Sequence, residues 1–414
     1  MVAVRPFRGL RSRPALAGEV ACPPYDVLST EEAREMAKGK PNSFLRVDKA
    51  EIEFEPGVDP YSDRVYAKAR ENLDALIRAG VMLRDPEPCY YLYRLTWRGR
   101  SQTGLIALTS VDEYDAGRIK KHEHTRPEKV RDRANHIEKV QAQVGLVFSA
   151  FRQRAAIAQL FGKVTALAPA TAFATADSVR HELWVVRDQA TKEAIGEAFA
   201  ATDPLYIADG HHRSQAASEV CRRFRERTPN FTGEEPENFF INVLFPHDEL
   251  RILAYNRVVR DGCGLGLDQI LERAAEKFDV RPSSGAVEPA RAHQFGLYAE
   301  QRWFVLEARP GTFDPAHPTQ SIDAAILARN LLEPVFGITD PKTDKRIDFV
   351  GGIRGTHELV RAVDSGKFKI AFSLHPTSIE QLFKVADSGE VMPPKSTWFE
   401  PKLLSGVVAH VLSG

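Results

Sequence analysis

The chain has 414 residues, of which 43% are hydrophobic and 27% charged, and its 56 basic side chains are balanced by 56 acidic ones. This composition is that of an ordinary globular protein, and a chain of this length is expected to form two or three domains with ample core. Because the formal net charge is zero, we exclude a protein whose whole surface follows nucleic acid or an anionic membrane, while a local basic pocket is still allowed.

The apolar spacing, capping residues and turn residues predict the elements of the first half of the chain. In chain order these are an extended or turning stretch at 22–26, helices over 29–38 and 62–79, strands over 90–97 and 103–111, a helix from about 126 to 144, strands over 146–151 and 181–187, a helix over 191–201, a strand over 205–208 and a helix over 213–227. Thr125 and Glu128 are expected to form a capping box at the start of the third helix.

For the second half of the chain, the same patterns predict the following elements. They are a hairpin over 239–259, a helix over 267–278, a hairpin within 295–306, helices over 321–336 and 357–363, a strand over 368–374, a helix over 378–385 and a Pro-rich loop at 392–395. Helices and strands interleave but hairpins are frequent, so we predict an α+β fold with mixed sheets and two or more closely packed subdomains. The Gly-rich turn at 261–264 is the best boundary, which gives domains 1–262 and 263–414.

The four cysteines lie far apart and form no CxxC pair, so a zinc ribbon and a thioredoxin motif are excluded. Sparse cysteines suit a reducing compartment. The N-terminal residues hold no long apolar core, and no apolar run approaches the ~20 residues of a membrane-spanning helix. We therefore expect a cytoplasmic protein without a membrane partner.

The sharpest local feature is the run LYIADGHHR at 205–213, in which a short strand ends and a helix begins with two histidines and an arginine. A helix N-terminus has free N–H groups and the positive end of the helix dipole, so acidic residues are usual there. Arg213 works against this dipole, and a bound phosphate would explain it. Asp209 could cap the helix, hold a histidine tautomer or ligate Mg²⁺. The alternative is a plain capped turn with solvated histidines.

A second cluster precedes the predicted helix start near residue 126, in the run KKHEHTR. Alternation would place two histidines on one side and Glu123 on the other. The spacing matches no HExxH motif, although histidine and carboxylate groups are good metal ligands. A phosphate or substrate site fits the basic content better, with Glu123 as general base. The contacts would be Lys120, His122, His124 and Arg126; the alternative is a solvated charged loop.

A third candidate is the run MPPKSTWF at 392–399. Two prolines stiffen the approach, and Lys395, Ser396 and Thr397 are donors of the kind that bind phosphate. The glycine spacing of a P-loop is absent, and the chain holds no GxSxG elbow that would support a hydrolase triad. The alternative is a rigid surface turn.

Several separated motifs together resemble one family, the bacterial and archaeal domain-of-unknown-function family 1015, whose members have no assigned reaction. The resemblance runs over nearly the whole chain. Its motifs are Arg5-Pro6-Phe7, Pro23-Pro24-Tyr25-Asp26-Val27, the block Lys120 to Arg133, Asp209 to Arg213, and Met392 to Phe399.

Through the strand–Asp-Gly-His-His-Arg–helix element, that family is similar to the ParB/sulfiredoxin superfamily, which includes CTP-binding ParB proteins, sulfiredoxin and ADP-dependent free serine kinases. The resemblance implies phosphate contacts at Gly210, His211, His212 and Arg213, with Asp209 as a polar or metal-bridging partner. No motif aligns the catalytic carboxylate of the kinases, for which Glu123 is our first candidate and Asp26 the second. The turn holds no cysteine, so sulfinic-acid reduction is not expected, and no ParB-like helix-turn-helix is evident.

The favoured function is a nucleotide-dependent phosphotransferase that uses ADP or ATP with Mg²⁺ and acts on a small hydroxylated metabolite, with free L-serine as the favoured acceptor. Glu123, Asp209 and His212 would be catalytic. Three alternatives stay open: a phosphatase of phosphoserine-like esters, a ParB-like nucleotide-switched binding protein, and a metal-dependent hydrolase built on His122, His124, His211 and His212. Nucleic acid is not expected as a partner. The sequence leaves the oligomeric state, the acceptor, the nucleotide and the direction of transfer undefined.

Overall fold

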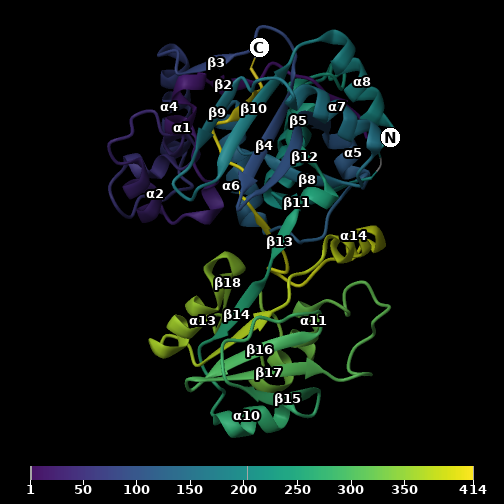
Figure 1. Ribbon diagram of the computed structural model, residues 1–414. Helices are drawn as coiled ribbons and strands as arrows, with labels where there is room; N and C mark the ends of the chain where they lie inside the picture. The colour runs from purple at the N-terminus through teal and green to yellow at the C-terminus, as the bar shows by residue number, and fades with distance from the viewer. Residues whose placement is uncertain (1, 203, 414) are drawn as a thin grey trace. The chain divides into compact units, whose positions relative to one another are not determined.

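The computed structural model describes residues 2–202 and 204–413, which form two compact units (Figure 1). The first unit comprises Met1–Lys121, Thr125–Leu250 and Pro401–Gly414, and the second comprises His122–His124 and Arg251–Glu400. The two domains drawn from the sequence, 1–262 and 263–414, stay a prediction. Among the described helices, none combines the length and the hydropathy needed to cross a membrane.

The first unit is built on a nine-stranded mixed sheet with the strand order β6-β11-β8-β12-β5-β4-β10-β9, in which β1 also pairs with β5. The pairs β11–β6 and β12–β8 are parallel and the others antiparallel. The strands are β1 (Val4–Arg5), β4 (Tyr90–Trp97), β5 (Arg100–Ser110), β6 (Ile119–Lys120), β8 (Val147–Phe151), β9 (Thr171–Ala174), β10 (Arg180–Val186), β11 (Leu205–Asp209) and β12 (Phe239–Pro246).

A smaller antiparallel sheet of the same unit has the order β3-β2-β21-β7. Its strands are β2 (Leu10–Ser12), β3 (Met82–Arg84), β7 (Ala142–Gln143) and β21 (Val408–Val411). The α-helices of the unit are α1 (Ala17–Val20), α2 (Thr30–Ala37), α3 (Leu45–Asp48), α4 (Asp63–Arg78), α5 (Val111–Asp115), α6 (Pro127–Val140), α7 (Ala155–Thr165), α8 (Gln189–Ala200) and α9 (His211–Arg227), with short 3₁₀ turns at Pro14–Leu16, Tyr25–Val27, Ala50–Glu53, Pro236–Asn238 and His247–Glu249.

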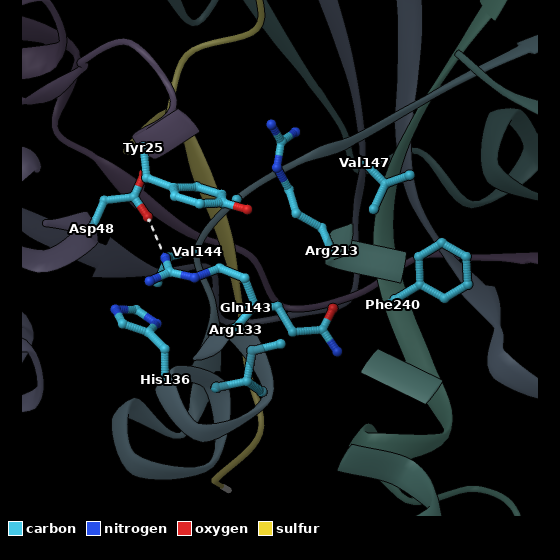
Figure 2. Close-up of a pocket in the computed structure, with 11 residues that line it drawn as sticks. Tyr25, Asp48, Arg133, His136, Gln143, Val144, Val147, Arg213 and Phe240 are labelled. Carbon is cyan, nitrogen blue, oxygen red and sulfur yellow. Dashed lines mark ion pairs between the residues drawn. The ribbon is translucent and has the colours of Figure 1, made fainter. Parts of the chain in front are cut away.

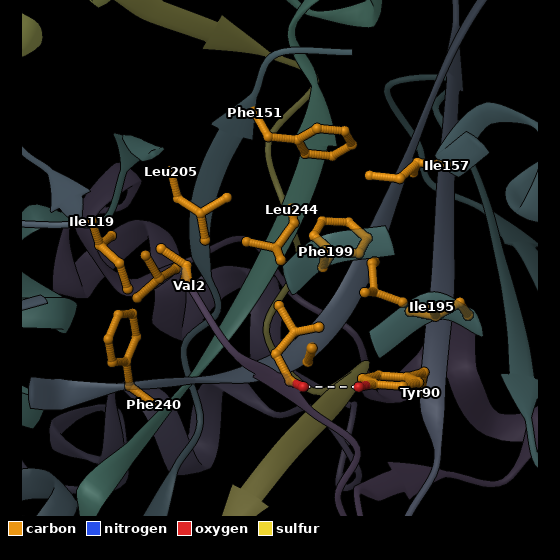
Figure 3. Close-up of a cluster of buried hydrophobic side chains, with 14 of the residues drawn as sticks. Val2, Tyr90, Ile119, Phe151, Ile157, Ile195, Phe199, Leu205, Phe240 and Leu244 are labelled. Atoms are coloured by element: carbon orange, nitrogen blue, oxygen red, sulfur yellow. Dashed lines mark hydrogen bonds between the residues drawn. The ribbon is translucent and has the colours of Figure 1, made fainter. Parts of the chain in front are cut away.

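A large core of the first unit lies between the main sheet and helices α7 and α8. Ile157 of α7 and Phe199 of α8 pack with Phe151, Leu205 and other apolar side chains of the strands (Figure 3). Each fully buried large apolar side chain contributes about 1.5–3 kcal/mol. A second cluster joins α6 to α9 through Ala134, Ile137, Ala216, Val220 and Leu412. This second contact matters for function, because α6 and α9 carry the charged residues of the candidate site.

The second unit is a six-stranded antiparallel sheet with the order β15-β17-β16-β19-β14-β18, together with the pair β13–β20. Its strands are β13 (Arg251–Leu253), β14 (Tyr255–Val259), β15 (Phe278–Ser283), β16 (Gln294–Ala299), β17 (Arg302–Ala308), β18 (Ile347–Gly351), β19 (Ile370–Leu374) and β20 (Trp398–Glu400). Its helices are α10 (Leu267–Ala274), α11 (Asp323–Leu327), a π-helical stretch Ala328–Leu332, α12 (Glu333–Phe336), the 3₁₀ turn Gly352–Arg354, α13 (Gly355–Asp364) and α14 (Ile379–Ser388).

The predicted α+β class with mixed sheets is confirmed, and so are most of the elements. Ser29 caps α2 through the expected capping box. Three details are wrong. The strand β12 forms no hairpin with β14, because β12 pairs with β5 and β8 while β14 pairs with β18 and β19. Phe278 opens a strand instead of closing a helix. Helix α6 begins at Pro127 with Arg126 as its N-cap, so the Thr125 capping box does not form.

Asp323, at the start of α11, is a buried carboxyl group with unusual titration. Its Oδ1 accepts a hydrogen bond from the His293 N–H at 2.8 Å, while among the described residues its Oδ2 has no partner. Burial raises the pKa of this carboxyl to about 7, and hydrogen bonds from the backbone N–H groups of His293 and His375 only partly oppose the shift. The folded state therefore holds a proton that the unfolded chain releases near pH 4.

Between about pH 4 and pH 7 the stability of the second unit should fall as pH rises, because only the unfolded chain gains the charged form, and the total effect is on the order of 4 kcal/mol. The Asp323→Asn variant should lose this pH dependence, and the exposed Glu272→Gln on α10 should retain it. Chemical unfolding followed at several pH values measures both. If Asp323→Asn keeps the wild-type dependence of the free energy of unfolding on pH, Asp323 is not the group that causes it.

Candidate functional site

The N-terminus of α9 follows strand β11 through a single residue, Gly210. Its φ of +95° lies in the left-handed region, and a Cβ atom there would come within 3.3 Å of both the Val147 Cα and the Arg213 Nη1. No side chain caps α9, and its first turn holds no acidic residue. The expected strand–turn–helix element is therefore present, with the helix beginning at His211, two residues earlier than predicted.

Replacing Gly210 by alanine tests whether the turn between β11 and α9 tolerates a side chain. Gly210→Ala should cost about 1–2 kcal/mol for the left-handed backbone and about 1–3 kcal/mol more for the crowding. Gly233→Ala is the matched control, because Gly233 has a φ of +90° and no atom within 4 Å of the added Cβ. Chemical unfolding of both variants isolates the crowding. Equal losses of stability would show that the approach to Val147 is unimportant.

Asp209, the last residue of β11, forms an ion pair with Lys402. The Lys402 Nζ donates to the Asp209 Oδ2 at 3.0 Å. Burial would raise the pKa of this carboxyl, but the positive charges of Lys402 and Arg213 outweigh it and hold the pKa well below its usual range. Asp209 is therefore a carboxylate at neutral pH, and Lys402 compensates its charge beside the helix start.

The two histidines of the first turn differ in their surroundings. His211 is 4% exposed, and burial lowers its pKa to about 4 although the Asp209 carboxylate opposes the shift. It is neutral at pH 7. The His212 Nε2 accepts a hydrogen bond from the Arg126 N–H at 3.1 Å. This hydrogen bond links the start of α9 to the N-cap of α6.

Arg213 is the buried cation of the site, with 8% of its surface exposed. Its Nη2 donates to both carboxylate oxygens of Asp26, at 3.1 and 3.3 Å, and its Nη1 donates to the Leu146 carbonyl. Among the described residues, its Nε finds no hydrogen-bond partner although the atom is buried. Burial opposes the charge, but Asp26 and Asp209 raise the pKa of Arg213 above its ordinary value. The side chain is a permanent cation with donor capacity left.

A second, half-buried arginine, Arg133, lies next to the first across the ring of Tyr25. The guanidinium carbon of Arg133 is 4.1 Å from the centre of this ring and that of Arg213 is 5.9 Å from it, so the ring lies between two cations (Figure 2). Arg133 donates to both oxygens of Asp132 and forms an ion pair with Asp48 at 3.6 Å. Each of the two arginines is therefore paired with carboxylates, Arg213 with Asp26 and Arg133 with Asp48 and Asp132.

A small cavity of about 30 Å³ separates these groups (Figure 2). Its lining residues are Tyr25, Asp48, Arg133, His136, Ile137, Gln143, Val144, Gly145, Val147, Arg213 and Phe240. Since a water molecule needs about 10–15 Å³ on the same measure, the cavity has room for about two waters. It is far smaller than a nucleotide pocket, for which ~300 Å³ or more is usual.

The residues predicted from sequence fall into both units. The first unit holds the segment Asp209 to Arg213 together with Lys120 and Arg126. Lys120 lies on β6 opposite Tyr206 of β11, and the Arg126 N–H reaches His212, so two of the predicted clusters meet here. Of the sequence-predicted site residues, the second unit holds His122, Glu123, His124, Lys395, Ser396 and Thr397.

Within the second unit, the 122–124 segment contacts the loop at 392–399. The Met392 N–H donates to the His122 carbonyl at 2.8 Å, and the Thr397 Oγ1 lies 3.4 Å from the His122 Nε2. His122 is buried, while His124 and Lys395 are exposed. The geometry thus joins two motifs that are about 270 residues apart in the printed sequence.

Sequence analysis missed Lys402, Asp48 and Arg133 as members of the site. Arg133 belongs to a motif block that the resemblance pointed to, but nothing marked it apart from its neighbours. Lys402 and Asp48 carry no local signal, because their partners Asp209 and Arg133 lie far away along the chain.

The residues do not form a metal site around Asp209. Within the described residues, no group of three or more histidine, cysteine, aspartate or glutamate side chains is arranged to hold a metal ion. The one carboxylate at the helix start already binds the ammonium group of Lys402, and Mg²⁺ prefers oxygen ligands. We therefore derive no step through Mg²⁺ at this residue.

The fold and the site define an α+β protein with a cationic, uncapped helix start beside a buried network of ion pairs. The profile of the family described as a protein of unknown function, DUF1015, matches residues 4–325. The chain belongs to this family. No curated protein matches it.

Among solved structures, the chain is similar to a free serine kinase in complex with AMP, with 13% identity and a TM-score of 0.35 over 71% of this chain and 86% of that one. It is also similar to SbnI with C-terminal truncation from Staphylococcus aureus (11% identity, TM-score 0.39, 72% and 85% covered). A conserved hypothetical protein from Pyrococcus furiosus gives 13% identity and a TM-score of 0.33, with 72% and 92% covered. Likeness at this level carries no argument about the activity of this chain.

Proposed function

We propose that the first unit binds the phosphates of an adenine nucleotide, ADP or ATP, at the N-terminus of α9, and that the protein transfers a phosphoryl group between the nucleotide and a small hydroxylated metabolite. The observation that carries the proposal is the first turn of α9. Gly210 brings the backbone close, no side chain caps the helix, and Arg213 stands where acidic residues are usual. Helix N–H groups and a guanidinium together bind phosphate oxygens.

The donor groups present fit a phosphate. The buried Arg213 Nε has no partner among the described residues, and Gly210 allows the left-handed turn that starts the helix directly after the strand. Because Lys402 compensates Asp209, this carboxylate does not repel an anion as an isolated one would. Because His211 is neutral, one of its ring nitrogens is a hydrogen-bond donor and the other is an acceptor, and the tautomer decides which is which.

Phosphoryl transfer depends mainly on positioning and charge neutralisation. In the proposed reaction the acceptor oxygen bonds to phosphorus, the bond from phosphorus to the leaving phosphate oxygen breaks, and a carboxylate takes the hydroxyl proton. Asp26 is a candidate for this base, since its side chain is 39% exposed and Arg213 orients it. Glu123 is the other candidate, and the roles of His122, His124 and Lys395 to Thr397 as further substrate contacts stay predictions.

We also infer that β11, Gly210 and α9 form a phosphate-binding element of the ParB/sulfiredoxin type. The support is the order strand, left-handed glycine and basic helix start. The resemblance of this element to that of the serine kinases makes free L-serine the favoured acceptor.

The direct test incubates the full-length protein with L-serine, Mg²⁺ and either ADP or ATP. Mass spectrometry and ³¹P NMR should detect O-phosphoserine, and L-alanine, which lacks the hydroxyl, should give no product. Calorimetric titration with each nucleotide tests the first-unit site separately. Absence of both binding and product would refute the proposal, whereas binding without product would refute serine as acceptor. Release of phosphate from phosphoserine without nucleotide would identify a phosphatase instead.

A further inference from the structure

The second unit buries a guanidinium group that no carboxylate within the described residues neutralises. Arg257 lies on β14, which pairs with the edge strand β18 on one side and with β19 on the other, and is 3% exposed. Among the described residues, no carboxylate oxygen lies within ion-pair distance of it. Burial lowers its pKa to about 10, with only Tyr255 opposing the shift, so the group is still charged at pH 7. A buried charge without a partner is costly, which makes this residue exceptional.

The hydrogen bonds of Arg257 are also incomplete. Its Nη1 donates to the Tyr255 carbonyl and its Nη2 donates to the Pro394 carbonyl at 3.3 Å. A guanidinium has five N–H donors, so within the described part of the chain three of them have no acceptor. The guanidinium carbon lies 5.0 Å from the centre of the Phe349 ring, which offers only weak compensation. Water would satisfy the N–H groups but would leave the charge unbalanced.

The loop whose Pro394 carbonyl accepts a hydrogen bond from Arg257 also carries a second cation. Lys395 directly follows Pro394, and its Nζ is 5.6 Å from the centre of the Tyr255 ring. The backbone of Lys395 has a φ of +58°, which is unusual for a residue with a side chain. Strained residues of this kind concentrate at ligand sites. Glycine or asparagine would suit the turn better, so the ammonium group is a reason for a lysine here.

The loop itself is firmly held. The Ser396 Oγ donates to the Pro393 carbonyl at 2.7 Å, and the Thr377 Oγ1 donates to the Ser396 carbonyl at 2.8 Å. The Trp398 ring packs edge-on against Tyr255 with the ring centres 5.0 Å apart. A Cβ atom on Gly351 would lie 2.8 Å from the Trp398 ring, so glycine makes this packing possible. Lys395 is thus fixed on a firmly held loop, and Arg257 on a strand that is paired on both sides.

We propose that Arg257 and Lys395 form a binding site for a small oxyanion, the phosphate or carboxylate group of a metabolite. The planar fork of Arg257 can bind two oxygens of such a group, and Lys395 adds a point charge from the exposed side. Lys395 is also one of the substrate contacts predicted for the proposed function, but this site is defined by residues of the second unit alone, and its test uses neither nucleotide nor serine.

Chemical footprinting of the full-length protein tests the site locally. Acetylation of exposed lysines is followed by peptide mass mapping in inorganic phosphate, in acetate and in chloride at equal ionic strength. Lys367 is the internal control, because it is also exposed in the second unit and its Nζ lies 5.5 Å from the centre of the Phe368 ring. A phosphate bound at the site should slow acetylation of Lys395 by about tenfold once its concentration reaches about ten times its Kd.

The expected result is that phosphate or acetate slows the acetylation of Lys395 in a saturable way. The acetylation rate of Lys367 should be the same in phosphate and acetate as in chloride. The more effective anion identifies the chemical group. Arg257→Gln should abolish the protection. The proposal would be overturned if the anions slowed acetylation of Lys395 no more than acetylation of Lys367. This comparison needs only the wild-type protein. Protection that survives in a folded Arg257→Gln variant would overturn it as well.

Discussion

Replacing Arg213 by glutamine should lower kcat/KM for phosphoryl transfer by about 10³-fold or more, because an arginine that neutralises a transferring phosphate contributes on the order of 10³–10⁵. Arg213→Lys should retain part of the nucleotide affinity, since it keeps the charge but loses the fork that holds Asp26. The measurements are initial rates of phosphoserine formation and calorimetric titration with ADP and ATP.

The matched control is Arg222→Gln on the same helix, since Arg222 is exposed and, among the described residues, its ion pairs are with Glu219 and Glu226. Its kinetics should match the wild type. Arg213 is also structural, so circular dichroism must show that the variant is folded. A folded Arg213→Gln protein that binds nucleotide as tightly as the wild type would remove the main support for the proposed function.

Replacing Arg133 by glutamine should lower the free energy of unfolding by about 3–5 kcal/mol, because it leaves two buried carboxylates without their cation. Asp48 and Asp132 both have nearly inaccessible side chains. Asp48 would retain a hydrogen bond from the Ser405 Oγ at 2.8 Å, and Asp132 one from the Tyr66 hydroxyl at 2.9 Å. Neither donor supplies the lost charge.

Arg131→Gln is the control for this change, because Arg131 is exposed on the same helix two residues earlier. Surface substitutions of this kind usually change the free energy of unfolding by less than about 0.5 kcal/mol. Chemical unfolding measures both variants. If Arg133→Gln lowers the free energy of unfolding no more than Arg131→Gln does, the buried network is unimportant for stability.

Local signals predicted most elements correctly. The Ser29 capping box and the apolar stripe of α4 each depend on residues within a few turns of one another. The β4–β5 hairpin closes through Arg98 and Gly99, which both have positive φ. The hairpin expected over 239–259 failed because strand pairing is decided by partners that are remote in sequence. β12 pairs with β5 and β8 in the first unit, and β14 pairs with β18 and β19 in the second.

The sequence by itself determined the helix start of the candidate site, since Asp209, Gly210 and the residues after them are neighbours in the chain. Only the tertiary structure decided which charges accompany it. Asp26 reaches Arg213 from 187 residues away, and Lys402 reaches Asp209 from 193 residues away. The formal charge of zero hid this arrangement, because a net charge is a sum over the chain, whereas the field at a site depends on distance and burial. The same reason explains Arg257, which the sequence shows only as one more arginine in a strand.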